Sequence, residues 1–173
     1  MMNRRALSII LAGSTLAGCA ATAQSNMASQ SAVGGDLTGL RLQALQGGAF
    51  LMQTAQLGAS KAQRPELRRF APFEVSEQQG LVQAMGLVGS SATPPALTGE
   101  KAAMLQRLQT ASGPEFDRMF VIAQIQGHRE ALPVYVAILQ NNAAPAADRA
   151  IALLAADRIR EHLAYLEAIS SRA

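Results

Sequence analysis

Apolar residues recur along the chain at steps of three and four, which is the spacing of one face of an α-helix. The clearest line lies between Ser112 and Gln140, and a second line of the same kind lies near the end of the chain. Each line includes one of the two histidines in the sequence. The members are Asp117, Val121, Gln124, His128, Leu132, Tyr135 and Leu139 in the first line and Ile151, Ala155, Ile159, His162, Leu166 and Ile169 in the second. Both histidines are therefore expected on core-facing sides of their helices.

A third line follows Pro65, which fits the first position of a helix. Two polar residues, Glu74 and Gln78, interrupt its apolar members. An inward carboxylate needs a partner, and a histidine or an arginine of a neighbouring helix could supply one. The members of this line are Leu67, Ala71, Glu74, Gln78, Leu81 and Met85. Glu74 is therefore a candidate partner for the two histidines.

The whole pattern predicts four long helices and one short one. Alanine and leucine dominate the apolar content and no useful alternating run exists, which favours helices over sheets. Ser112 and Glu115 have the spacing of a capping box, and the short helix is expected across the end of the bundle. The expected helices cover 37–62, 65 to the loop at 89–99, 100–110, 112–140 and 145–169. The predicted fold class is all-α, an antiparallel four-helix bundle with a short extra helix between helices 2 and 3.

The N-terminus has the pattern of a signal peptide. Two arginines precede an apolar run of about 11 residues, which is shorter than the roughly 20 needed to span a bilayer. The run ends in Leu16, Ala17, Gly18 and Cys19, which resembles the lipobox of bacterial lipoproteins. Cys19 is the only cysteine, so an exported chain could form no internal disulfide. We expect a signal peptide over 1–18 and acylation of Cys19, including palmitate; the alternative is ordinary secretory cleavage beside an incidental cysteine.

The residues after Cys19 indicate where the protein resides. By resemblance to the sorting rule of Gram-negative lipoproteins, Ala20 implies transfer to the outer membrane, with the domain facing the periplasm. The segment 21–35 has no charged and no aromatic residue and cannot bury a core. We therefore expect a flexible tether over 19–35, a bundle domain over 36–173, and a membrane as partner through acylated Cys19.

Charge and motifs exclude several functional classes. The chain has 15 Lys and Arg against 12 Asp and Glu, but Arg4 and Arg5 belong to the expected signal peptide, so the remainder is nearly balanced. There is no basic block beyond Arg64, Arg68 and Arg69, which disfavours nucleic-acid binding. The sequence contains no nucleophile elbow, phosphate-binding glycine loop or zinc-type His-x-x-x-His spacing. We therefore do not expect an enzyme.

Four short segments, in order, resemble one protein family. They are Gln63–Ala71 (QRPELRRFA), Glu115–Phe120 (EFDRMF), Gln126–Leu132 (QGHREAL) and Glu161–Leu163 (EHL). Together they resemble the bacterial envelope family catalogued as domain of unknown function 4142, over about residues 49–169. The resemblance implies a ferritin-like fold and an exported protein or lipoprotein.

The chain departs from that family at two positions. The family usually carries an acidic residue near Leu51 and an Asp-His pair where this chain has Glu77 and Gln78. Ferritin-like metal centres draw carboxylates and imidazoles from all four helices. The resemblance therefore implies a centre that has lost two donors here.

Two interpretations of the histidines remain open. His128 is either a core histidine, hydrogen-bonded to Gln124 or Gln78, or a metal ligand. The preferred function is a non-catalytic, lipid-anchored periplasmic bundle with a degenerate metal centre, no cofactor and an unidentified protein or small-ligand partner. The alternative is a ferritin-like protein that binds a divalent metal through His128, His162 and Glu74. Asp117 lies 11 residues before His128, about 16 Å along a helix, and is interpreted as a first-turn dipole residue.

Overall fold

The structure is a computed structural model that describes residues 36–89 and 93–171, and this part of the chain is helical. Its helices match the residue pattern closely. They are α2 (Leu37–Lys61), α3 (Pro65–Leu87), α4 (Gly99–Thr110), α5 (Gly113–Gln140) and α6 (Ala146–Ser170). The pair Gly47 and Gly48 does not interrupt α2, and Pro72 and Pro133 lie inside continuous helices.

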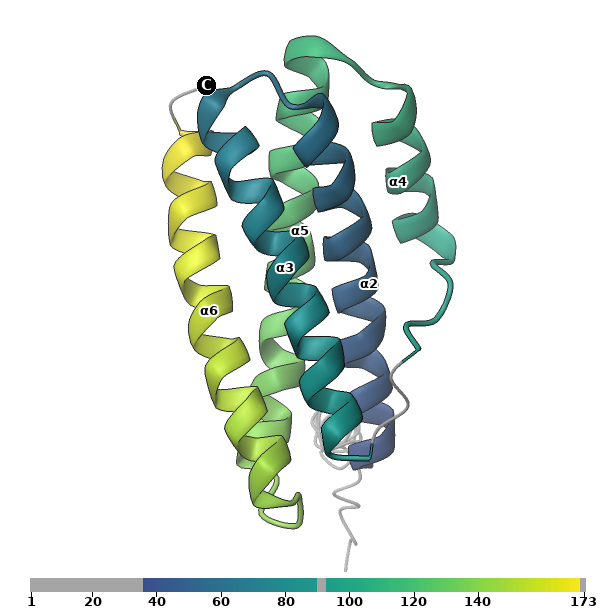
Figure 1. Cartoon of the computed structure of the whole chain (residues 1–173), viewed down its shortest axis with the longest axis vertical. Helices are drawn as coiled ribbons and strands as arrows, with labels where there is room; N and C mark the ends of the chain where they lie inside the picture. Colours follow the sequence, from purple (N-terminus) through teal and green to yellow (C-terminus); the bar gives the residue numbers. More distant parts are fainter. Residues whose placement is uncertain (1–35, 90–92, 172–173) are drawn as a thin grey trace, which may run out of the picture.

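The four long helices form a bundle in which α2 runs antiparallel to α3, and α5 runs antiparallel to α6 (Figure 1). Helix α3 packs on α2, α2 on α5, and α5 on α6, whereas α3 and α6 contact each other much less. The segment from α3 to α5 returns along the length of the bundle, so that α3 and α5 run in the same direction (Figure 1). One long crossover of this kind is the ferritin-like arrangement, so the predicted fold class is confirmed.

Two expectations for the region around α4 are wrong. Helix α4 lies beside α2 and α5, not across the end of the bundle, because Leu108 is fully buried in the core they share (Figure 1). The capping box is also not formed, since Ser112 makes no side-chain cap hydrogen bond. Gly113 has a φ of 61°, outside the right-handed helical region, so regular geometry begins one residue too late for the Ser112 and Glu115 spacing.

The core consists of two apolar clusters separated by a polar layer. One cluster is rich in phenylalanine, including Phe116 and Phe120, and the other is rich in alanine and contains Tyr135. Five of the buried polar residues form this layer: Thr54, Glu74, Gln78, Gln124 and His128. These residues lie on α2, α3 and α5, so the polar layer involves three of the four long helices.

Two buried acidic groups outside the polar layer hold elements together. Asp148 receives two hydrogen bonds from Arg41, at 2.7 and 2.6 Å, which join α6 to α2. Asp117 accepts backbone N–H groups of Gln63 and Arg64, at 2.9 to 3.3 Å, where α3 begins. Asp117 therefore caps a neighbouring helix, whereas the sequence had suggested only an interaction with the dipole of its own helix.

No helix among residues 36–89 and 93–171 is both long and apolar enough to cross a membrane. The predicted signal peptide, the lipobox at Leu16, Ala17 and Gly18, the acylated Cys19 and the tether all lie outside the described residues.

Candidate metal centre

Three helices each direct one metal-binding side chain into the polar layer. Glu74 comes from α3, His128 from α5 and His162 from α6, each from the apolar line that predicted it. Glu74 is fully buried, the His128 side chain is 1% exposed, and the His162 side chain is 13% exposed. The bundle therefore brings together three residues that lie up to 88 positions apart in the sequence.

The donor atoms converge on one point of the core. Oε2 of Glu74 lies 2.9 Å from Nδ1 of His162 and 3.3 Å from Nε2 of His128. The two imidazole nitrogens are 3.1 Å apart. Ligands that bind one transition-metal ion at about 2.0–2.2 Å lie roughly 3–3.5 Å from one another. The three spacings fit a single ion, and these residues form the potential metal-binding group found among the described residues.

The outer nitrogen of each histidine has its own partner. Nδ1 of His128 donates to the backbone carbonyl oxygen of Gln124 at 2.7 Å. In the neutral imidazole this places the lone pair on Nε2, which faces Glu74. Nε2 of His162 lies 3.5 Å from the carboxylate of Glu77. Such second partners orient metal-binding histidines and increase their basicity.

The two oxygens of Glu74 have different surroundings. Oε1 accepts a hydrogen bond from the side-chain amide of Gln78 at 2.9 Å. Oε2 is buried and accepts no hydrogen bond of regular geometry among the described residues, although the two imidazole nitrogens lie within 3.3 Å of it. A buried carboxylate oxygen without a donor is costly. Oε2 is thus the Glu74 oxygen whose nearest polar neighbours are the two histidines.

The electrostatics of the site favour a positive charge at its centre. Burial alone would raise the pKa of Glu74, but the adjacent His128 and His162 outweigh burial and lower the pKa to about 2. Burial would likewise lower the pKa of His128, but the Glu74 carboxylate outweighs it and raises that pKa above its usual value. Glu74 is therefore ionised at neutral pH. Its charge is balanced either by a proton on the histidines or by a metal ion.

Helix α2 closes the fourth side of the site without a donor. Leu51, 1% exposed, packs against α5 where a Cβ added at Gly127 would lie 2.6 Å from its side chain. The amide of Gln124 donates to the backbone carbonyl oxygen of Leu51 and to the hydroxyl of Thr54, which ties α5 to α2. Leu51 and Thr54 thus join α2 to α5 but offer no metal donor, and all three candidate donors lie on α3, α5 and α6.

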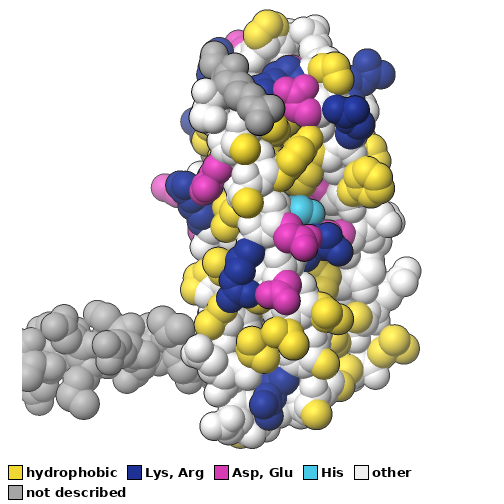
Figure 2. All heavy atoms as spheres, turned by 90° about the vertical axis from the view of Figure 1, so that its left-hand side faces the viewer, with side chains coloured by type: hydrophobic (Ala, Val, Ile, Leu, Met, Phe, Trp, Pro, Cys, Tyr) yellow, Lys and Arg dark blue, Asp and Glu magenta, His cyan; other side chains and the backbone are white. Residues whose placement is uncertain are grey.

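A groove between α3 and α6 gives His162 its exposure. The groove has a volume of about 1000 Å³ and apolar walls that include Phe70, Phe73, Leu154 and Tyr165. Phe70 packs edge-on against His162, with ring centroids 5.0 Å apart. Figure 2 shows this face of the molecule, with histidine atoms visible between acidic and basic side chains. The outer edge of the site therefore borders solvent, whereas Glu74 and His128 do not.

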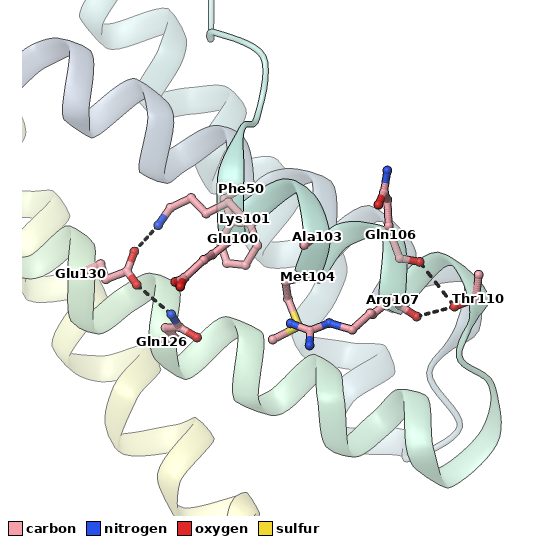
Figure 3. A pocket seen from close by; sticks show the side chains of 10 residues that line it. All are labelled: Phe50, Glu100, Lys101, Ala103, Met104, Gln106, Arg107, Thr110, Gln126 and Glu130. Carbon is pink, nitrogen blue, oxygen red and sulfur yellow. Dashed lines mark hydrogen bonds and ion pairs between the residues drawn. The ribbon is translucent and has the colours of Figure 1, made fainter.

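A second hollow lies between α4 and α5 and has a different character (Figure 3). Its volume is about 750 Å³, and both Lys101 and Gln126 bind the carboxylate of Glu130. None of the three candidate metal donors lines it. This hollow is therefore separate from the candidate metal centre.

The structure brings together the four polar residues singled out in the sequence. Glu74, Gln78, His128 and His162 do meet, and His128 bonds to the Gln124 backbone one turn earlier, as the core-histidine interpretation expected. Glu161, which precedes His162, is 65% exposed and pairs with Arg158 outside the site. Glu77 was not proposed for the site, although its spacing of three from Glu74 would have indicated the same face of α3.

Comparisons with known proteins agree with this fold. A family model described as "Domain of unknown function (DUF4142)" matches residues 21–169. The chain is also similar in structure to a DUF305 fragment from Deinococcus radiodurans, with a TM-score of 0.65 and 16% sequence identity. That match covers 80% of this chain and 98% of the other, and at this identity it bears on the fold alone. No curated protein matches the chain.

Proposed function

Because the chain belongs to the DUF4142 family, whose function is unknown, we propose from its own residues that it binds one divalent transition-metal ion. The ligands are Glu74, His128 and His162. The observation that carries this proposal is Oε2 of Glu74, a buried carboxylate oxygen with no hydrogen-bond partner among the described residues and with two imidazole nitrogens within 3.3 Å. A bound cation satisfies all three atoms at once.

The donor set indicates the class of metal. Two imidazoles and one carboxylate suit zinc, iron or cobalt, whereas calcium and magnesium prefer sites built from oxygen. Three protein donors leave at least one coordination position for water or another small ligand. When bound, the ion would supply Lewis acidity at that position.

The same residues explain why one ion is proposed and not two. Two-metal centres of the ferritin-like fold use carboxylates from each of two helices and Glu-x-x-His pairs from the other two. Here Leu51 on α2 is apolar and Gln78 on α3 offers an amide. The expected degenerate centre is therefore proposed to retain the donors of a single ion.

We propose a non-catalytic, lipid-anchored role for this metal-binding domain. The support is in the sequence: the run from Leu16 to Cys19 has the form of a lipobox, and Ala20 fits retention at the outer membrane. No nucleophile motif accompanies the site. In this proposal Cys19 fixes the chain to the outer membrane, and the bundle presents its metal centre to the periplasm.

A second candidate is a purely structural polar layer. The geometry that favours it is the approach of Nδ1 of His162 to within 2.9 Å of Glu74, together with the raised pKa of His128. In that case a proton on an imidazole balances the carboxylate, and the site is a buried ion pair. The protein would then be a binding or envelope-associated module with no metal.

Metal analysis of the purified protein after extensive dialysis separates these two functions. We expect about one equivalent of zinc, iron or cobalt in the wild-type protein, retained against dialysis. The variant His128→Ala should lose it, with an affinity loss larger than the roughly 10–100-fold that removal of a second partner costs. Glu161→Gln is the matched control, because this exposed carboxylate adjoins His162 in sequence but pairs with Arg158. A wild-type protein without stoichiometric metal, or a His128→Ala variant that keeps it, would contradict the metal site.

The anchoring proposal has its own test. Cys19→Ser should abolish acylation and move the protein from the membrane fraction to the soluble periplasmic fraction. Fractionation followed by mass spectrometry of the N-terminus measures both effects. Unchanged processing and membrane attachment of the variant would show that Cys19 is not the anchor.

A further inference from the structure

Gln78 is a buried polar residue whose side chain bonds to a candidate ligand without being a ligand itself. It lies one turn after Glu74 on α3, is 5% exposed, and donates its amide N–H to Oε1 of Glu74 at 2.9 Å. This hydrogen bond engages one carboxylate oxygen and leaves the other, Oε2, facing His128 and His162. The two oxygens of Glu74 thus have different neighbours before any ion binds.

The space for this amide comes from a glycine on the opposite helix. A Cβ added at Gly48 of α2 would lie 2.7 Å from Oε1 of Gln78, closer than real Cβ atoms approach. The neighbouring Gly47 is not constrained in this way, because a Cβ there would meet Ala131 at an ordinary 3.8 Å. Helix α2 therefore provides no ligand at this level, but a side chain at position 48 would displace the end of the Gln78 side chain from its present position.

The number of free carboxylate oxygens affects which metal a site prefers. A carboxylate with both oxygens available can bind an ion in bidentate fashion, whereas one with an engaged oxygen binds through the other. Zinc and cobalt are satisfied by four donors in a tetrahedral arrangement. Manganese and magnesium need more oxygen ligands. At this site a neighbour of the His162 imidazole is instead the aromatic ring of Phe70.

We propose that Gln78, admitted by Gly48, is a positioning residue that keeps Glu74 monodentate and thereby makes the centre prefer zinc or cobalt over manganese. This inference rests on the proposed metal site and adds its specificity. Gln78 does not contact the ion, since it acts through the orientation of Glu74. Gly48 does not contact Glu74 either, since it acts through Gln78.

The test uses cobalt absorption spectra and competition between zinc and manganese in the purified protein. Wild-type protein should show the intense visible bands of four-coordinate cobalt. Gln78→Ala should weaken these bands and lower the preference for zinc over manganese by about 10–100-fold, the usual effect of removing such a second partner. Gly48→Ala should change both readouts in the same direction. The double variant should be no worse than Gln78→Ala alone, because both substitutions remove the same hydrogen bond.

Matched controls keep the result specific. Gly80→Ala adds the same methyl group on α3, where nothing lies within 4 Å, and should leave spectrum and preference unchanged. Gln78→Met keeps a side chain of similar length without the amide donor, and it decides the matter if Gln78→Ala does not fold. Circular dichroism confirms the helical content of each variant.

The outcomes separate the two proposals. If the wild-type protein takes up neither zinc nor cobalt, the metal site and this inference are both wrong. If the wild-type protein binds the ion but the Gln78 variants keep its spectrum and its preference for zinc, only the positioning role is overturned. Changes of equal size in Gly80→Ala and Gly48→Ala would also overturn it.

Discussion

Three buried carboxylates of this bundle, Glu74, Asp117 and Asp148, are satisfied in different ways. Asp148 receives two hydrogen bonds from the Arg41 guanidinium, and Asp117 receives three from the backbone at the start of α3. Glu74 has one conventional donor, the amide of Gln78, and its second oxygen has none among the described residues. All three residues are at most 5% exposed, so burial alone does not distinguish them.

The difference distinguishes structural acids from a candidate ligand. A buried charge is tolerated when the fold supplies its donors, as it does for Asp117 and Asp148. At Glu74 the fold instead supplies two imidazoles, which can hold either a proton or a metal ion between themselves and the carboxylate. A buried charge that no fixed donor of the chain balances is typical of a cation-binding site. The following predictions test this contrast between Glu74 and the two structural acids, Asp117 and Asp148.

The largest effect on stability is expected at the Asp148 pair. Arg41→Ala leaves Asp148 buried without its partner, and the free energy of unfolding should fall by about 3 kcal/mol. Urea denaturation measures this loss, which should be the same with and without zinc. Arg160→Ala is the control, since its pair with Asp157 is exposed and should contribute less than about 0.5 kcal/mol. A loss that added zinc restores would mean that the bundle ends and the metal centre are coupled.

The next effect concerns stabilisation by metal. At a zinc concentration of 100 times the Kd, binding should stabilise the wild-type protein by about 2.7 kcal/mol. Glu74→Gln should abolish this gain, because a neutral amide is a much weaker metal ligand than a carboxylate. Thermal unfolding with and without zinc measures the stabilisation. Asp117→Asn is the control and should keep the full gain. Equal zinc stabilisation of the Glu74→Gln variant would show that the metal binds elsewhere.

A smaller loss is expected for the cap on α3. Asp117→Ala removes the acceptor for the backbone N–H groups of Gln63 and Arg64, and should cost about 1–2 kcal/mol. Hydrogen exchange of these two amides should accelerate, whereas amides near His128 should not change. Protection of Gln63 and Arg64 that survives the substitution would argue against capping by Asp117.

The last effect is the pH dependence of the metal-free protein. Glu74 has its pKa lowered to about 2, so the stability it contributes is present above its unfolded value of 4.5 and is lost as the pH falls below it. His128 has a raised pKa, so its contribution is full below the unfolded value of 6.5 and is lost as the pH rises through the folded-state pKa.

Stability without metal should therefore be greatest between about pH 4.5 and 6.5, with slopes of no more than about 1.4 kcal/mol per pH unit for each proton. With metal bound, stability should no longer fall above about pH 6.5, because imidazoles bind metal in their deprotonated form. Urea denaturation from pH 3 to 9 measures both curves. The profile of Glu74→Gln should be flatter, and an unchanged profile would assign the dependence to other groups.

The sequence by itself determined which sides of the helices face inward. The steps of three and four predicted all five helices to within a few residues, and they placed Glu74, Gln78, His128 and His162 on core-facing lines. This succeeds because a helix has a fixed period, so local spacing decides which residues share a face. The same local rule failed at Ser112, where the left-handed φ of Gly113 shifts the start of the helix.

Only the tertiary structure decided that these residues meet at one level of the bundle. The axial position of one helix against another is set by long-range packing, such as the Leu51 contact at Gly127 and the Arg41 pair with Asp148 across 107 residues. No local pattern encodes these contacts, and neither the space that Gly48 gives to Gln78 nor the orphaned oxygen of Glu74 can be read from spacing. The sequence supplied the candidate ligands, and the packing of the helices brought them within 3.3 Å of one another.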